Sequence, residues 1–123
     1  MAKKNKTSRE ASLQSRLRIR SGEDIALGPG KVELLALVDE TGSIGEAAKR
    51  MEMSYMRAWS LIQTMNACFK EPMVAAVRGG HQRGGAELTE TGRRALELYQ
   101  RMEAASLKAA QTDWPAFQKL LRD

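Results

Sequence analysis

The sequence lacks the features that mark membrane-spanning and secreted proteins. It holds no run of about 18 apolar residues, the minimum from which a helix crosses a membrane. Its single cysteine, Cys68, excludes a disulfide within the chain and fits a reducing cytoplasm. No apolar run follows the basic start at residues 1–7, so we expect no secretory signal. These absences favour a cytoplasmic protein, and a length of 123 residues favours one domain.

Side chains that carry enzymatic chemistry are also scarce. The one histidine, His81, lies in a glycine-rich segment that cannot fix its geometry, and Cys68 lies in an expected helix, so the two do not make a metal site. Asp39 and Glu40 are adjacent at an expected helix end and point to different sides, which rules out a catalytic carboxylate pair. We therefore expect no enzyme, no metal and no cofactor.

Positive charge is concentrated at the start of the chain. Residues 1–20 hold seven basic residues against Glu10 alone, a net charge of +6, so the other 103 residues sum to −1. The first twelve residues are polar and predict a disordered basic arm. Such an arm either contacts DNA phosphates or remains a solvated tail, and the sequence leaves both interpretations open.

The spacing of apolar residues predicts a mainly helical fold with a small β-wing. Helices are expected over 29–39, 43–50, 54–69, 89–110 and 114–121, and strands over 17–20, 25–27, 73–78 and 86–88. We divide the chain into a disordered basic arm (1–12), a winged helix-turn-helix and dimerisation domain (13–112) and a short carboxyl-terminal helix (113–123).

Two serine-capped helices in succession predict a helix-turn-helix. Ser43 followed by Glu46 forms a capping box, and Ala47 and Ala48 are small enough for two helices to cross closely. Ser54 caps the next helix, whose amino end would be free to enter the major groove of DNA. From this recognition helix, the residues expected to face DNA are Ser54, Tyr55, Met56, Arg57, Ser60 and Gln63.

The residue types at this helix end suit the edges of bases. Arg57 has the reach for two hydrogen bonds to guanine, worth about 1–3 kcal/mol of discrimination, and Tyr55 and Met56 suit thymine methyl groups. The alternative is a solvent-exposed face of an ordinary helical scaffold. Trp59 is interpreted as core filler packed against the first helix, with a base contact as the alternative.

A glycine-rich segment between the last two strands predicts a basic wing. No acidic residue occurs from Pro72 to Ala86, and no Gly-Lys-Ser/Thr follows the glycines, so this is not a nucleotide-binding loop. The alternative is a mobile surface loop. Lys49 either contacts a phosphate or offsets the helix dipole. The residues expected to contact DNA from the wing and the flanking backbone are Ser43, Lys49, Arg78, His81, Gln82 and Arg83.

Several motifs together resemble one family. With Ser54-Tyr55-x-x-Ala58-Trp59, double glycines at 79–80 and 84–85, and Leu88-Thr89, the chain resembles the amino-terminal winged-helix domain of ModE-type molybdate-responsive transcription regulators. That domain is itself similar to the DNA-binding domain of LysR-type regulators. The resemblance covers about residues 13–107 and implies a homodimeric, sequence-specific DNA binder. It also implies that the long helix over 89–110 is the dimerisation helix. The dimer-interface residues that it implies are Leu17, Leu96, Tyr99, Met102 and Leu107.

The resemblance also implies a function. We expect a transcription regulator, acting as a repressor on a pseudo-palindromic operator, associated with the nucleoid and linked to molybdenum metabolism. Family members carry a ligand-binding region of β-barrel modules after the long helix, whereas about 16 residues follow Leu107 here, so we expect no molybdate binding by this chain. The alternative function is a protein-interaction module, in which Met51, Met53, Met56 and the apolar carboxyl end of the chain offer an adaptable docking surface.

Overall fold

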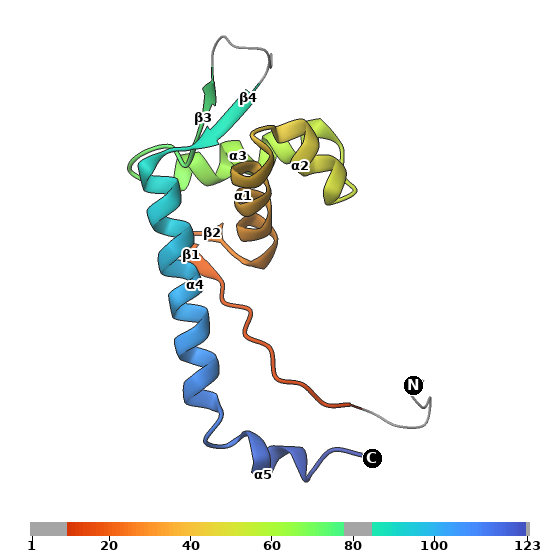
Figure 1. The fold of residues 1–123 in the computed structure, drawn as a ribbon. Helices are drawn as coiled ribbons and strands as arrows, with labels where there is room; N and C mark the ends of the chain where they lie inside the picture. Colours follow the sequence, from red (N-terminus) through yellow and green to blue (C-terminus); the bar gives the residue numbers. More distant parts are fainter. Residues whose placement is uncertain (1–9, 78–84, 123) are drawn as a thin grey trace.

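The chain forms a helical head from which one long helix projects (Figure 1). The computed structural model describes residues 10–77 and 85–122. In chain order, the elements are β1 (Ile19–Ser21), β2 (Asp24–Leu27), α1 (Pro29–Thr41), α2 (Ile44–Arg50), α3 (Tyr55–Cys68), β3 (Val74–Val77), β4 (Gly85–Leu88), α4 (Glu90–Ala110) and α5 (Trp114–Gln118). These elements confirm the predicted mainly helical fold with a small β-wing. No helix in these two ranges has the length and hydropathy of a membrane span.

A short antiparallel hairpin, β1–β2, precedes the first helix. Ser21 pairs with Asp24 across a turn in which Gly22 has a φ of 63°, a conformation that glycine adopts without strain. β1 begins at Ile19, two residues later than predicted. The reason is that the carbonyl of Leu17 accepts a hydrogen bond from the Tyr99 hydroxyl at 2.7 Å and does not pair with β2.

The core of the head lies between the first three helices. Leu34, Leu35 and Val38 of α1 are fully buried, and burying each such side chain contributes about 1.5–3 kcal/mol. Small side chains on α2 let α1 and α3 approach it closely, as predicted for Ala47 and Ala48. The buried residues of α2 and α3 are Ala47, Ala48, Ala58, Ile62 and Met65.

The end of α1 is fixed by two adjacent residues. Gly42 has a φ of 71°, and its amide donates to the carbonyl of Val38 at 2.8 Å, which confirms the predicted left-handed cap. The Thr41 hydroxyl donates to the carbonyl of Leu37 at 2.7 Å. Because this bond satisfies one of the last carbonyls, α1 runs to Thr41, two residues further than predicted.

The second hairpin, β3–β4, is attached to the helices at two points. Val77 pairs with Gly85 at its open end, and the amide of Ala86 donates to the carbonyl of Gly42 at 3.0 Å, which joins β4 to the α1–α2 turn. On the other strand, the side-chain oxygen of Asn66 accepts hydrogen bonds from the amides of Met73 (2.7 Å) and Val74 (3.4 Å). The hairpin is therefore held in a set direction relative to α3.

The first turn of α4 packs directly on the chain that leads into β3. The Thr89 side chain accepts from the amide of Gly92 at 3.0 Å, which confirms the predicted cap. Gly92 is buried beneath the backbone of Met73, and a Cβ atom at this position would lie 2.2 Å from the carbonyl oxygen of Met73. Only glycine allows this approach.

Tyr99 joins α4 to the segment that precedes β1. Its side chain is 1% exposed, and its hydroxyl donates to the Leu17 carbonyl. Ser15 and Ser106 extend this attachment through hydroxyl groups 2.7 Å apart. The sequence-based assignment of Tyr99 to a dimer interface is therefore corrected: its surface is already covered within one chain. The other four residues of that expected interface lie on surface that is at least partly accessible, and their role stays a prediction.

Removing the Tyr99 hydroxyl gives a prediction about stability and pH. Tyr99→Phe is expected to lower the free energy of unfolding by about 1 kcal/mol at neutral pH, because the hydroxyl bonds a backbone carbonyl in a buried setting. Burial, and then the nearby Glu103, raise the pKa of Tyr99 above its ordinary value of 10.0. The folded chain therefore holds this proton more tightly than the unfolded chain. The stabilisation that this proton gives is fully present below the ordinary pKa of 10.0, and it is lost as the pH rises through the raised pKa of the folded chain. Urea unfolding at neutral and alkaline pH measures both effects, and a variant as stable as the wild type contradicts the assignment.

Beyond Tyr99, α4 leaves the head and its residues are mostly exposed (Figure 1). The chain then turns into α5, which ends at Gln118, three residues earlier than predicted, and has no buried residue. The rings of Trp114 and Phe117 stack with centroids 6.3 Å apart. The end of the chain thus contributes nothing to the core.

Candidate nucleic-acid interface

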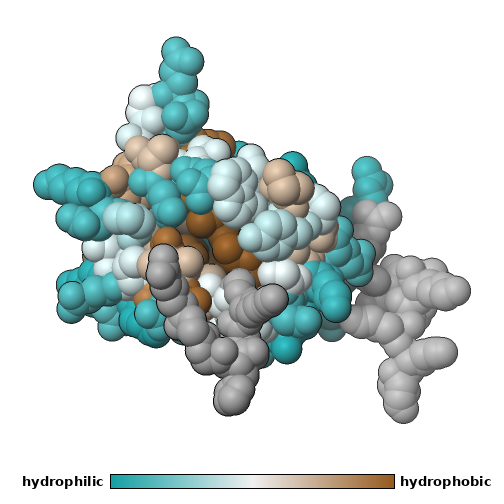
Figure 2. Space-filling model, turned by 90° about the horizontal axis from the view of Figure 1, so that it is seen from above, coloured by the Kyte–Doolittle hydropathy of each residue, from teal (hydrophilic) through white to brown (hydrophobic). Residues whose placement is uncertain are grey.

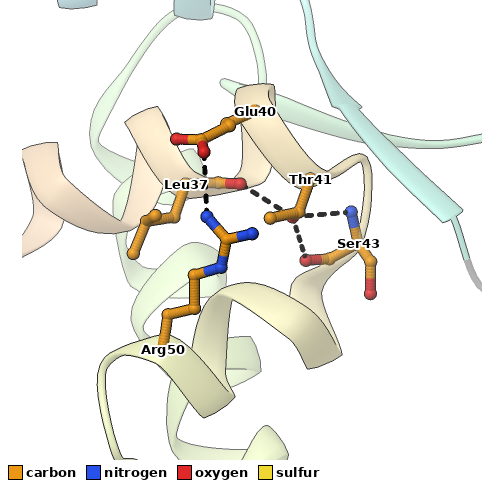
Figure 3. A network of polar contacts seen from close by, with 5 residues as sticks. All are labelled: Leu37, Glu40, Thr41, Ser43 and Arg50. Atoms are coloured by element: carbon orange, nitrogen blue, oxygen red, sulfur yellow. Dashed lines mark hydrogen bonds and ion pairs between the residues drawn. The ribbon is translucent and has the colours of Figure 1, made fainter.

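The amino end of α2 is organised by the side chains around Ser43 (Figure 3). The Ser43 hydroxyl accepts from the amide of Glu46 at 3.0 Å, as predicted. The reciprocal half of the capping box is not formed, because the amide of Ser43 donates to the Thr41 hydroxyl at 3.2 Å and Glu46 faces Lys49 at 3.6 Å. Arg50 bonds Glu40 of α1 at 2.8 Å. The basic residues of α2 are thus both paired with carboxylates.

The turn between α2 and α3 spans residues 51–54 and contains an unusual backbone conformation. Glu52 has a φ of 58°, which a residue with a side chain adopts at a cost of about 1–3 kcal/mol. Hydrogen bonds on both sides keep it there, since the amide of Glu52 donates to Lys49 and that of Met53 donates to Ala48, both at 3.0 Å. Met53 and Met51 pack partly buried against the core. This turn sets the angle between the two helices.

The amino end of α3 projects from the head into solvent. The Ser54 hydroxyl accepts from the amide of Arg57 at 3.1 Å, which confirms the predicted cap. Tyr55 is 51% exposed and Met56 is 66% exposed, whereas Ala58 and Ile62 are buried against the core. All six residues expected to face DNA from this helix are exposed: Ser54, Tyr55, Met56, Arg57, Ser60 and Gln63.

Trp59 belongs to this exposed surface, so its interpretation as core filler is wrong. Its side chain is 42% exposed, one turn after Tyr55 and beside Met56. The spacing of Ala58, Ile62 and Met65 already defines the buried stripe of α3, and Trp59 lies next to that stripe and outside it. The helical period of α3 is therefore the signal in the sequence that predicts an exposed position for Trp59.

The β3–β4 hairpin rises at the same end of the head as α2 and α3 (Figure 1). The expected wing residues Arg78, His81, Gln82 and Arg83 lie outside the described residues. The strands that lead to this segment are described. Viewed from this end, the molecule shows apolar surface near its middle, with hydrophilic residues around the margin (Figure 2). Such a face has apolar groups for base edges and polar groups for the sugar-phosphate backbone.

The charge of α3 favours a polyanion. Arg57 is its only charged residue, and a helix amino end adds a partial positive charge. Within residues 10–77 and 85–122, no group of three or more His, Cys, Asp or Glu is placed to hold a metal ion. The arrangement offers hydrogen-bond donors, a guanidinium group and apolar side chains on one protruding helix end, which are the groups that read a major groove.

The fold and this surface define a winged helix-turn-helix protein. No protein-family model matches the chain. Over 78 residues, 63% of its length, the chain is 44% identical to the molybdenum transport protein ModE of Azotobacter vinelandii. It is 38% identical over 84 residues to the transcriptional regulator ModE of Yersinia pestis. These matches confirm the resemblance to ModE-type proteins. The chain spans about a third of their length, 29% and 32% respectively.

A solved structure supports the fold independently. The chain aligns with a protein in a crystal structure of a CbnR_DBD–DNA complex with a TM-score of 0.54 and 22% identity. The alignment covers 71% of this chain and 94% of that one. At this identity the likeness concerns the fold alone.

Proposed function

We propose that this chain binds double-stranded DNA sequence-specifically and regulates transcription, as a repressor acting on a pseudo-palindromic operator. The observation that carries the proposal is the exposed amino end of α3, where Tyr55, Met56 and Arg57 protrude while the opposite face of the helix is buried. The names of the relatives add a link to molybdenum, and we propose that the regulated genes belong to molybdenum metabolism. The proposal assigns the chain no catalytic activity, cofactor or molybdate of its own.

Each exposed side chain of α3 has a stated role in this proposal. Arg57 donates to a guanine edge, and Tyr55, Met56 and Trp59 contact thymine methyl groups. Ser60 and Gln63 follow along the helix and bond bases or sugar-phosphate. Ser43 and Lys49, together with the wing segment, bind the backbone and fix the orientation of the head.

The fluorescence of Trp59 tests whether α3 enters the groove. The chain has two tryptophans, so a Trp114→Phe variant reports Trp59 alone. DNA carrying a site selected from a random pool is expected to change its emission saturably. The matched Trp59→Phe variant keeps Trp114, whose emission is expected to stay constant.

If Trp59 does not respond while the DNA is bound, α3 is not the reading element. If no DNA is bound at moderate salt, the alternative of a protein-interaction module takes the place of the proposed function.

The outer surface of α4 supports homodimerisation as part of the proposal. Leu98 and Met102 are 38% and 46% exposed, and exposed alanines follow at positions 105 and 109. The spacing of four, three and four residues is that of a coiled-coil seam. This stripe takes the place of Tyr99 in the expected interface and includes Met102 from it. Two-fold symmetry then sets half-sites about one helical turn, or a multiple of it, apart.

Charge on this stripe is expected to separate the two copies. The double variant Leu98→Lys and Met102→Lys should be monomeric by analytical ultracentrifugation, because paired helices would bury four added charges. Arg101→Ala, on the same helix between them, is the control and should leave the assembly unchanged. A wild-type chain that sediments as a monomer, or a double variant that remains dimeric, contradicts this interface.

A further inference from the structure

We propose that a second surface, beside the amino end of α3, binds a backbone phosphate of DNA. This surface, the basic groove, has a volume of about 450 Å³ and lies between the segment preceding β1, the start of α1 and the α2–α3 turn. The inference rests on the proposed function, because the phosphate belongs to the same duplex that α3 reads. The basic residues that line the groove are Arg16, Arg18, Lys31 and Arg57.

The groove is lined by charge of one sign. No aspartate or glutamate lines it, and within the described part of the chain none of its four basic residues forms an ion pair. Lys31 donates to the carbonyl of Ile25. By contrast, the head neutralises Arg50 with Glu40 and Arg93 with Asp39, at 2.8 and 2.9 Å. A cleft lined by uncompensated charge concentrates counter-ions, so the groove is suited to an anion.

The amino end of α1 opens into the same groove and adds to its positive potential. Pro29, Gly30 and Lys31, the first residues of α1, line the groove. α2, α3 and α4 each begin with a serine or threonine side chain bonded to an amide, whereas Gly28 gives α1 no side-chain cap and its first turn holds no acidic residue. The first amides of this 13-residue helix therefore remain available, as in helix ends that bind phosphate.

The position of Arg57 indicates that the phosphate comes from DNA. Arg57 lies in the first turn of α3 and also lines the groove, with Met51 and Met53 of the α2–α3 turn beside it. The groove is thus continuous with the end of α3 that would enter the major groove. A duplex placed there brings the backbone beside the contacted bases toward Arg18 and Lys31. Free phosphate has the same chemistry as a backbone phosphate. Only the phosphate of a duplex is also held in place by the contacts that α3 makes with the same DNA.

A charge-matched pair of double variants tests the inference. Arg18→Gln with Lys31→Gln removes two charges from the groove, and Lys119→Gln with Arg122→Gln removes two from the end of the chain, far from the head (Figure 1). Binding of the full chain to selected and to random duplexes is measured over a range of salt. The groove variant should bind both duplexes about tenfold more weakly, and the slope of log affinity against log salt should fall by about 1. The control should match the wild type.

Two results overturn the inference when DNA is bound. One is a groove variant that behaves like its control. The other is a loss confined to the selected duplex, because a phosphate contact is independent of sequence. If the wild type binds no duplex, the proposed function fails, and inorganic phosphate then tests the groove alone by NMR. Saturable shifts of the Gly30 and Lys31 amides, absent in the groove variant, support a phosphate site, and unchanged amides overturn it.

Discussion

Gly92→Ala is expected to lower the free energy of unfolding by about 3 kcal/mol, the upper part of the range for overpacking a core. The added Cβ would lie 2.2 Å from the carbonyl oxygen of Met73 and 3.1 Å from its carbonyl carbon. That backbone cannot move aside freely. Met73 accepts from the amide of Thr89 and donates to Asn66, so both of its peptide groups are fixed. The measurement is urea unfolding followed by circular dichroism.

Gly30→Ala is the matched control, since nothing lies within 4 Å of a Cβ added there. Gly30 lies in the first turn of α1, where alanine is the better helix former, so this variant should be as stable as the wild type or slightly more stable. If Gly92→Ala unfolds like Gly30→Ala, the close packing of α4 on the entry to β3 is wrong. The placement of the hairpin relative to α3 would then need revision.

Arg57→Ala is expected to reduce the preference for a selected duplex over a random one by about 1–3 kcal/mol, or about 5- to 150-fold. The reason is that a guanidinium group donates two hydrogen bonds to one guanine, a contact that no other base offers in that form. Binding to random DNA should weaken less, through the loss of one charge. Competition between the two duplexes in a mobility-shift assay measures the ratio directly.

Arg57→Lys separates base reading from charge. Lysine keeps the positive charge but lacks the planar pair of donors, so the variant should lose most of the preference and retain its affinity for random DNA. If Arg57→Lys keeps the full preference, one charged donor is enough to read the base, and the paired-donor contact to guanine is wrong. Either way the helix end contacts DNA, and the two variants together identify the kind of contact.

Local chemistry explains what could be predicted from the sequence. Ser43, Ser54 and Thr89 each cap the helix that follows through a side-chain bond to an amide three residues on, and this depends on neighbouring residues alone. The left-handed glycine at Gly42 is equally local. Because these signals mark where helices begin and end, the helix-turn-helix and the exposed end of α3 followed from them.

Contacts between distant residues could not be predicted in this way. Helical spacing identifies Tyr99 as apolar-facing, but it cannot say whether the same chain or a second copy covers it, and the Leu17 carbonyl that decides this lies 82 residues away. The bond between Asn66 and the amide of Met73 likewise depends on how β3 enters the hairpin. The basic groove combines three separate segments, so only the fold reveals that their charges converge.

The dimensions of α4 have a further consequence. Its 21 residues make a rod about 30 Å long, and only the part up to Tyr99 rests on the head. If two copies pair along the outer half of α4, as proposed, this rigid helix fixes the distance between their two α3 helices. Ser15 and Ser106 brace this rod well beyond the last buried residue. Such a dimer binds operators with one distance between half-sites, and it rejects operators in which that distance is lengthened by half a turn of DNA.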